Sequence, residues 1–69
     1  MKKLMTVSDY YDSLTNEDRR EFRKNVRVSS DLEYYQIVYR LKNNCWKRSE
    51  LNLINDMLDR GGQDVILTN

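Results

Sequence analysis

Four basic residues between positions 20 and 27 are spaced so that they could bind an anion together. On a helix, which turns by about 100° per residue, their side chains fall within an arc of about 100°: Arg20, Arg23, Lys24 and Arg27. Guanidinium and ammonium groups on one face are the partners that phosphates prefer. The alternative is that these charges only keep one face of a helix solvated.

A second polar group lies on the stretch from Ser30 to Trp46, which we expect to be the central helix. Its apolar residues would cover most of the helix circumference: Leu32, Tyr34, Tyr35, Ile37, Val38, Tyr39 and Leu41. A helix of this kind must contact neighbours on several sides, so we expect it to be the most buried element. Only a narrow polar strip is left to face solvent or a ligand: Glu33, Gln36, Arg40 and Asn43.

Residues that could catalyse a reaction near neutral pH are scarce. The sequence has no His, one Cys and no Gly-rich phosphate loop, so neither an acid–base centre nor a Cys/His zinc site can be assembled. The acidic pairs Asp9/Asp12 and Asp56/Asp59 are expected on exposed helix faces, where solvation explains them. We therefore expect no enzyme, no cofactor, no metal and no small-molecule substrate, and Cys45 is expected to be a small buried hydrophobic residue.

The length of 69 residues predicts one small helical domain over 1–69. Domains this small obtain about 3–5 kcal/mol from one core and usually need a staple, but a single Cys cannot form an internal disulfide. A homodimer or a protein partner could complete the core. No stretch approaches the ~18 apolar residues of a membrane span, and no signal-type apolar run follows the first lysines, so we expect no membrane contact and a cytoplasmic location.

The net charge of +1 hides an uneven distribution. Residues 19–48 contain nine basic and three acidic residues, a net charge of +6, whereas the rest of the chain carries −5. A basic middle between acidic ends indicates a surface that faces a polyanion, although an ordinary solvated mixture of charges is equally compatible with it.

Helical periodicity predicts an all-α fold, a compact bundle of four short helices. The expected segments are a lead-in (1–6), helices over 7–14, 16–27, 31–43 and 50–60, and a C-terminal tail (63–69). Thr15, Ser30 and Ser49 are the expected N-caps, Val28 a buried linker residue, and Gly61 the start of the final stop. The three adjacent apolar residues of the tail are too few for an independent strand.

The predicted core combines the apolar faces of all four helices. It contains Tyr10, Leu14, Phe22, Val26, Leu32, Tyr35, Val38, Leu41, Trp46, Leu51, Ile54 and Leu58. Leu41 is expected near its centre, where truncation to Ala would cost about 2–5 kcal/mol.

The order helix, short break, helix over residues 16–43 resembles the small helix-turn-helix proteins of phages and mobile elements. The resemblance covers about residues 7–60. It is carried by Ser13-Leu14-Thr15-Asn16-Glu17-Asp18-Arg19-Arg20-Glu21-Phe22-Arg23 and by Tyr39-Arg40-Leu41-Lys42-Asn43-Asn44-Cys45-Trp46. In such proteins the second helix of the pair enters the major groove of duplex DNA and the first crosses the backbone. The resemblance therefore implies a non-enzymatic DNA-binding regulator, inside the host cell if it is phage-encoded.

Carried onto this chain, the resemblance assigns two sets of contacts. The base contacts would be Gln36, Arg40 and Asn43, whose side chains pair well with base edges. The phosphate contacts would be Arg20, Arg23, Lys24, Lys42, Lys47 and Arg48. The chain departs from the pattern in lacking a turn glycine, and in having Asp31 and Glu33 at the helix end that would enter the groove.

The five tyrosines favour a different class of function, a small protein-interaction module. They are more than a core of this size can bury with every hydroxyl satisfied: Tyr10, Tyr11, Tyr34, Tyr35 and Tyr39. Tyr and Arg are enriched among the residues that dominate protein interfaces. An adaptor, an inhibitor of a host protein or a virion component would bind through such a tyrosine-rich surface.

Overall fold

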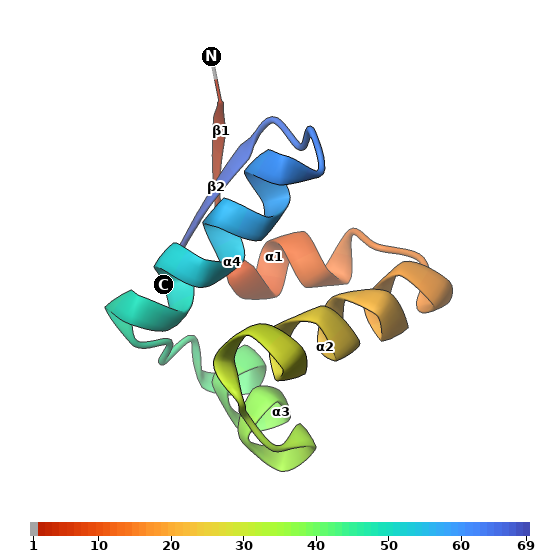
Figure 1. Ribbon diagram of the computed structural model, residues 1–69, viewed down its shortest axis with the longest axis vertical. Helices are drawn as coiled ribbons and strands as arrows, with labels where there is room; N and C mark the ends of the chain where they lie inside the picture. Colours follow the sequence, from red (N-terminus) through yellow and green to blue (C-terminus); the bar gives the residue numbers. More distant parts are fainter. Residues whose placement is uncertain (1) are drawn as a thin grey trace.

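Four helices and two short strands make up residues 2–69, the part of the chain that the computed structural model describes (Figure 1). In chain order they are β1 (Lys3–Thr6), α1 (Val7–Asp12), α2 (Asn16–Ser30), α3 (Tyr34–Asn43), α4 (Arg48–Arg60) and β2 (Val65–Thr68). The two strands lie near one end of the long axis of the molecule and α3 lies at the other (Figure 1). None of the helices in this range is long and apolar enough to cross a membrane.

The strands correct the expected all-α class, because the fold is mainly helical but not purely so. β1 and β2 pair in parallel, with Leu4 opposite Ile66 and Met5 opposite Leu67. The segments expected to be a lead-in and a tail therefore form one two-stranded sheet. Residue 1 of the lead-in lies outside the described residues. A four-residue segment gives too weak a pattern to identify alone, and its partner here comes from the far end of the chain. Within β2 the burial alternates, so Val65 and Leu67 face the helices.

The α2–α3 junction lies later in the sequence than expected. Thr15 caps α2 as predicted, its Oγ1 accepting the N–H of Asp18 at 3.2 Å. The helix then continues to Ser30, whose hydroxyl donates to the carbonyl of Val26 at 2.6 Å instead of capping α3. Asp31 ends α2 in the left-handed conformation, φ 56°, which Asp tolerates. Val28, expected to be a buried linker residue, is helical and 81% exposed.

The last two helices begin with the same kind of side-chain cap. Glu33 precedes α3, and its backbone N–H donates to Oε1 of Gln36 at 2.9 Å. α4 begins at Arg48, so the predicted cap Ser49 lies inside the helix. Glu50 instead accepts the backbone N–H of Lys47 at 2.9 Å. In both helices the third residue reaches back to the residue before the helix, which satisfies a donor that the helix leaves free.

The expectation that the central helix is the most buried element is wrong. α3 contacts α1 and α2, and Ile37 is its only fully buried residue in the described chain. Tyr35 and Val38, both predicted core residues, are 70% and 40% exposed. A chain of this length supplies too few neighbours to cover both sides of a helix.

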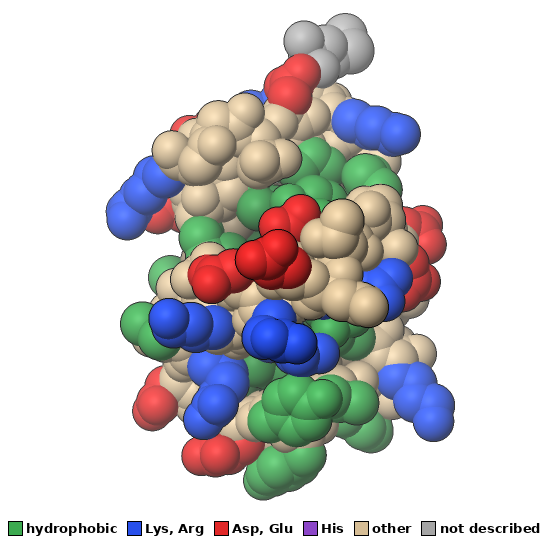
Figure 2. All heavy atoms as spheres, turned by 90° about the vertical axis from the view of Figure 1, so that its right-hand side faces the viewer, with side chains coloured by type: hydrophobic (Ala, Val, Ile, Leu, Met, Phe, Trp, Pro, Cys, Tyr) green, Lys and Arg blue, Asp and Glu red, His purple; other side chains and the backbone are tan. Residues whose placement is uncertain are grey.

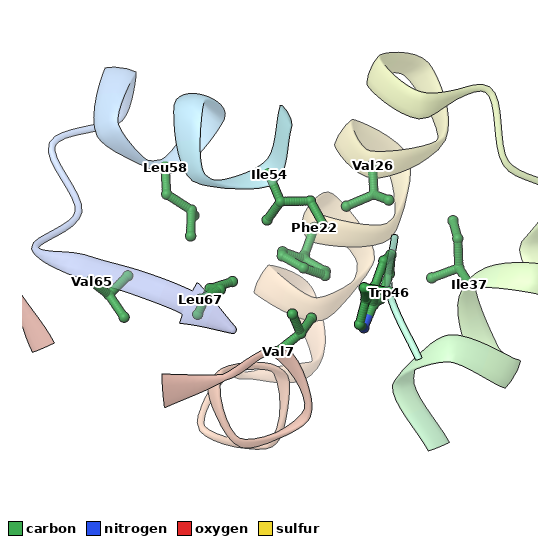
Figure 3. Packing of buried hydrophobic residues seen from close by; sticks show 9 residues of the cluster. All are labelled: Val7, Phe22, Val26, Ile37, Trp46, Ile54, Leu58, Val65 and Leu67. Atoms are coloured by element: carbon green, nitrogen blue, oxygen red, sulfur yellow. The ribbon is translucent and has the colours of Figure 1, made fainter. Parts of the chain in front are cut away.

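Nine side chains form the core, and Figure 3 shows them converging from five elements and the α3–α4 linker. They are Val7, Phe22, Val26, Ile37, Trp46, Ile54, Leu58, Val65 and Leu67. Trp46 is 3% exposed and fills the core as predicted. Its neighbour Cys45 is exposed, which contradicts its predicted burial. The other predicted core residues are partly buried around this cluster: Tyr10, Leu14, Leu32, Leu41 and Leu51.

Truncation of Ile37 to Ala should therefore destabilise the fold by about 2–5 kcal/mol, because its fully buried side chain would leave a cavity. Leu41 is only partly buried, and we expect a smaller cost for Leu41→Ala. Urea unfolding followed by circular dichroism measures both. Val28→Ala, at an 81% exposed helix position, is the control and should stay within about 0.5 kcal/mol. A larger loss for Leu41→Ala than for Ile37→Ala would contradict this packing.

Candidate nucleic-acid interface

Three residues of α2 present unpaired positive charge to solvent. Arg20, Lys24 and Arg27 are exposed, and their side chains make no hydrogen bond or ion pair within residues 2–69. They recur at intervals of four and three residues, which places them on one face of α2. We call these three residues the basic ridge.

The fourth basic residue, Arg23, is half-buried and holds three helices together. Its Nη1 donates to the Tyr11 hydroxyl of α1 at 2.8 Å. Its guanidinium carbon also lies 5.4 Å from the centre of the Tyr34 ring at the start of α3, a distance typical of a cation–π contact. Arg23 therefore positions α3 beside the ridge, while part of its donor capacity is already used inside the protein.

The ridge and the start of α3 enclose an open hollow. Its lining is Arg20, Arg23, Lys24, Arg27, Val28, Asp31, Leu32, Glu33 and Tyr34. Four cations against two carboxylates give the lining a net positive charge. Figure 2 shows Lys and Arg side chains across the middle of one face, with Asp and Glu side chains directly above them and hydrophobic side chains below them towards the α3 end. An anion bound there would lie beside an aromatic ring.

Two of the three predicted base-contacting residues are engaged inside the protein. Arg40 Nε donates to Oε1 of Glu50 on α4 at 2.9 Å, and these side chains are only 14% and 9% exposed. Arg40 Nη1 also lies 3.4 Å from the carbonyl of Gln36, whose own side chain caps α3. Arg40 thus joins α3 to α4. The side chains of Gln36 and Arg40 are both used within the protein, so the structure does not present them for base contacts.

The remaining residues that were predicted to contact DNA are exposed, and they lie on α3 and at the start of α4, outside the basic ridge. Asn43 donates from Nδ2 to the carbonyl of Tyr39 at 2.9 Å, which leaves its amide oxygen free to accept. Lys42 lines a second hollow with Tyr34, Val38 and Leu41, on the α1 side of α3. Lys47 and Arg48 are exposed around the start of α4. Arg23 and Tyr34 line both hollows.

The exposed face of α3 is aromatic. The prediction that α3 would contact bases through its polar strip did not include these aromatic residues. Tyr34, Tyr35 and Tyr39 are 52%, 70% and 61% exposed, and Val38 lies between them in sequence. The i, i+4 spacing of Tyr35 and Tyr39 is the sequence signal that places them on one face. Arg27 was likewise in the predicted arc without being assigned a contact. The tyrosines are thus divided, because Tyr10 and Tyr11 pack against Phe22 with ring centroids 5.9 and 5.7 Å apart.

The perturbed titratable groups lie away from this face. Partial burial, and secondly the nearby carboxylate of Asp18, raise the pKa of the Tyr10 hydroxyl. The hydrogen bond from Lys2 lowers the pKa of exposed Asp59. No group of three potential metal ligands occurs in the described part of the chain.

No family model, curated protein or solved structure matches the chain.

Arg40→Ala should destabilise the protein by about 3–5 kcal/mol, because it would leave the carboxylate of Glu50 buried without its partner. Arg48→Ala, on the exposed first turn of α4, is the matched control and should stay within about 0.5 kcal/mol. Denaturant unfolding compares the two variants. Equal, small effects would show that Arg40 is available for an external ligand.

Proposed function

We propose that this chain is a small non-enzymatic DNA-binding protein, a regulator of the phage or mobile-element type, that contacts duplex DNA with α2 and α3. The observation that carries the proposal is the basic ridge. Three exposed cations, whose side chains have no partner within residues 2–69, line a hollow together with Tyr34 at the start of α3. When cations on one face of a protein neutralise the phosphates of a duplex, the counterions condensed on the DNA are released, and this release favours binding.

The contacts divide by chemistry between the two helices. The ridge on α2 supplies phosphate contacts, which orient the protein but carry no sequence information. The exposed side of α3 supplies Tyr35, Val38 and Tyr39 to the groove, where apolar atoms pack on thymine methyl groups. Lys42 and Asn43 extend this side towards the end of α3. Arg40 acts in this scheme through Glu50, by holding α3 against α4.

The salt dependence of duplex binding tests the role of the ridge. Arg20→Ala/Lys24→Ala/Arg27→Ala should weaken binding to all sequences alike, and should reduce the slope of log K against log salt by up to about 2.7, because each phosphate contact contributes about 0.9. Arg23 is kept because it supports α3. Lys2→Ala/Lys3→Ala/Arg60→Ala removes the same charge from the sheet end and is the matched control. An unchanged slope in the ridge variant, or no duplex binding by the parent protein at low salt, would contradict the proposal.

Asp31→Asn should tighten duplex binding. The Asp31 carboxylate lines the hollow beside the ridge, where it would repel a phosphate. Asn retains the left-handed conformation of this position, φ 56°, so the turn should survive the change. The expected gain is up to about fivefold at low salt, because one unit-charge interaction at about 4 Å in water is worth about 1 kcal/mol. Weaker binding by a normally folded variant would place the phosphates elsewhere.

The exposure of Tyr35 and Tyr39 favours a second candidate function, binding of a protein partner. Such a partner would cover the aromatic face of α3, and its affinity would depend on the tyrosines more than on salt. Tyr35→Ala/Tyr39→Ala distinguishes the two functions when compared with the ridge variant. A protein ligand would be lost with the tyrosines and retained without the ridge, whereas duplex DNA would be lost without the ridge.

A further inference from the structure

The two outer edges of the β1–β2 sheet differ in how their backbone groups are satisfied. At the edge of β2, the Asn55 side chain of α4 binds both polar groups of one residue. The N–H of Leu67 donates to Asn55 Oδ1 at 2.7 Å, and Asn55 Nδ2 donates to the carbonyl of Leu67 at 3.0 Å. This amide takes the place of a neighbouring strand, so the β2 edge is closed to another chain at that point.

The edge of β1 is open. The Lys3 N–H donates to the carbonyl of Asp64 at 3.1 Å, so the backbone groups of Lys3 and, two residues on, Met5 point towards β2. Those of Leu4 consequently point away from β2, and they have no partner within residues 2–69. An unpaired strand edge is a template for another strand.

The outer face of the sheet is also apolar at this point. Leu4 lies directly beside Ile66, and the two side chains are 69% and 39% exposed. Neither contributes to the nine-residue core, whereas Val65 and Leu67 on the opposite face do. Two of the three apolar residues of the C-terminal tail are thus used within the chain itself. At the sheet end of the molecule, the unpaired backbone groups lie at the β1 edge.

We propose that the β1 edge pairs with β1 of a second copy, antiparallel and centred on Leu4. The two-fold arrangement gives a four-stranded sheet, β2–β1–β1–β2, with an unbroken row of Ile66, Leu4, Leu4 and Ile66 on its outer face. Leu4 faces Leu4 of the other copy, Lys3 faces Met5, and Lys2 faces Thr6. No lysine lies opposite another lysine, and Lys2 is neutralised within its own chain by Asp59 at 2.6 Å. A parallel arrangement of the two strands would instead stack the lysines.

This interface is independent of the proposed DNA-binding face. The sheet lies near the end of the molecule opposite α3 (Figure 1), so pairing through β1 leaves the ridge and the tyrosines exposed. Loss of self-association therefore leaves DNA binding by each copy intact, and loss of the ridge leaves self-association intact.

Sedimentation at high micromolar concentration tests the interface. The parent protein should reach twice the monomer mass of 8.4 kDa, and Leu4→Glu should shift it to the monomer. The exposed side chain at this position makes a folded variant the expected result, which circular dichroism checks. Leu53→Glu, the same change at a 42% exposed position on α4, is the control and should still dimerise. A parent protein that is monomeric throughout, or a dimer that survives Leu4→Glu, would overturn the proposal.

Cysteine cross-linking tests the register independently of sedimentation. In a Cys45→Ser background, Leu4→Cys places two thiols on facing residues, whose Cα atoms lie about 5.5 Å apart in a hydrogen-bonded antiparallel pair. That distance is within the range of a disulfide. Mild oxidation should cross-link this variant rapidly, and should cross-link Thr6→Cys slowly because position 6 faces position 2. Equal rates for the two variants would mean random collision and would overturn the register.

Discussion

The packing of β2 between β1 and α4 is the interaction on which the rest of the fold depends. Val65 and Leu67 place alternate side chains against Ile54 and Leu58 of α4 (Figure 3). The outward backbone groups of Leu67 are satisfied by Asn55, so the strand is held on both of its edges. Two segments from opposite ends of the chain thereby supply core that the helices alone lack. With no disulfide or described metal cluster, this closure takes the place of a covalent staple.

The same shortage of core explains the exposed face of α3. Ile37 fills the available space on one side, and the tyrosines on the other side have no neighbour in the described chain that covers them. The helix is nevertheless fixed in direction, because Arg40 joins it to Glu50 on α4 and Arg23 contacts Tyr34 from α2. The start of this helix also lines a hollow with the three cations of the basic ridge, whose side chains have no partner within residues 2–69. The function proposed here follows from that combination.

Local chemistry made part of the fold predictable from the sequence. Thr15 followed by acidic residues marked the start of α2, and the spacing of Phe22 and Val26 identified its buried face. The strands escaped prediction because parallel pairing depends on a partner some sixty residues away, as in Leu4 with Ile66. The start of α3 was misplaced because Ser30 resembles a cap, while the chain uses Glu33 and Gln36 instead.

The candidate site was predictable to a similar extent. The arc of basic residues follows from helix geometry alone, so the ridge was found. The role of Arg40 could not be predicted, because its partner Glu50 lies in another helix. An Arg on a polar strip has the same sequence pattern whether it faces a ligand or a buried carboxylate. Which tyrosines are covered depends in the same way on tertiary packing, as Tyr11 against Phe22 shows.

The most direct test of the central claim is a titration of the isotopically labelled protein with mixed duplex DNA, followed by amide NMR at low salt. The largest shifts should fall on α2 from Arg20 to Arg27 and on the Tyr35–Tyr39 side of α3. Signals of β1 and β2 should change little. Shifts confined to the sheet end, or absent throughout, would contradict the assignment of the α2–α3 face as the nucleic-acid interface.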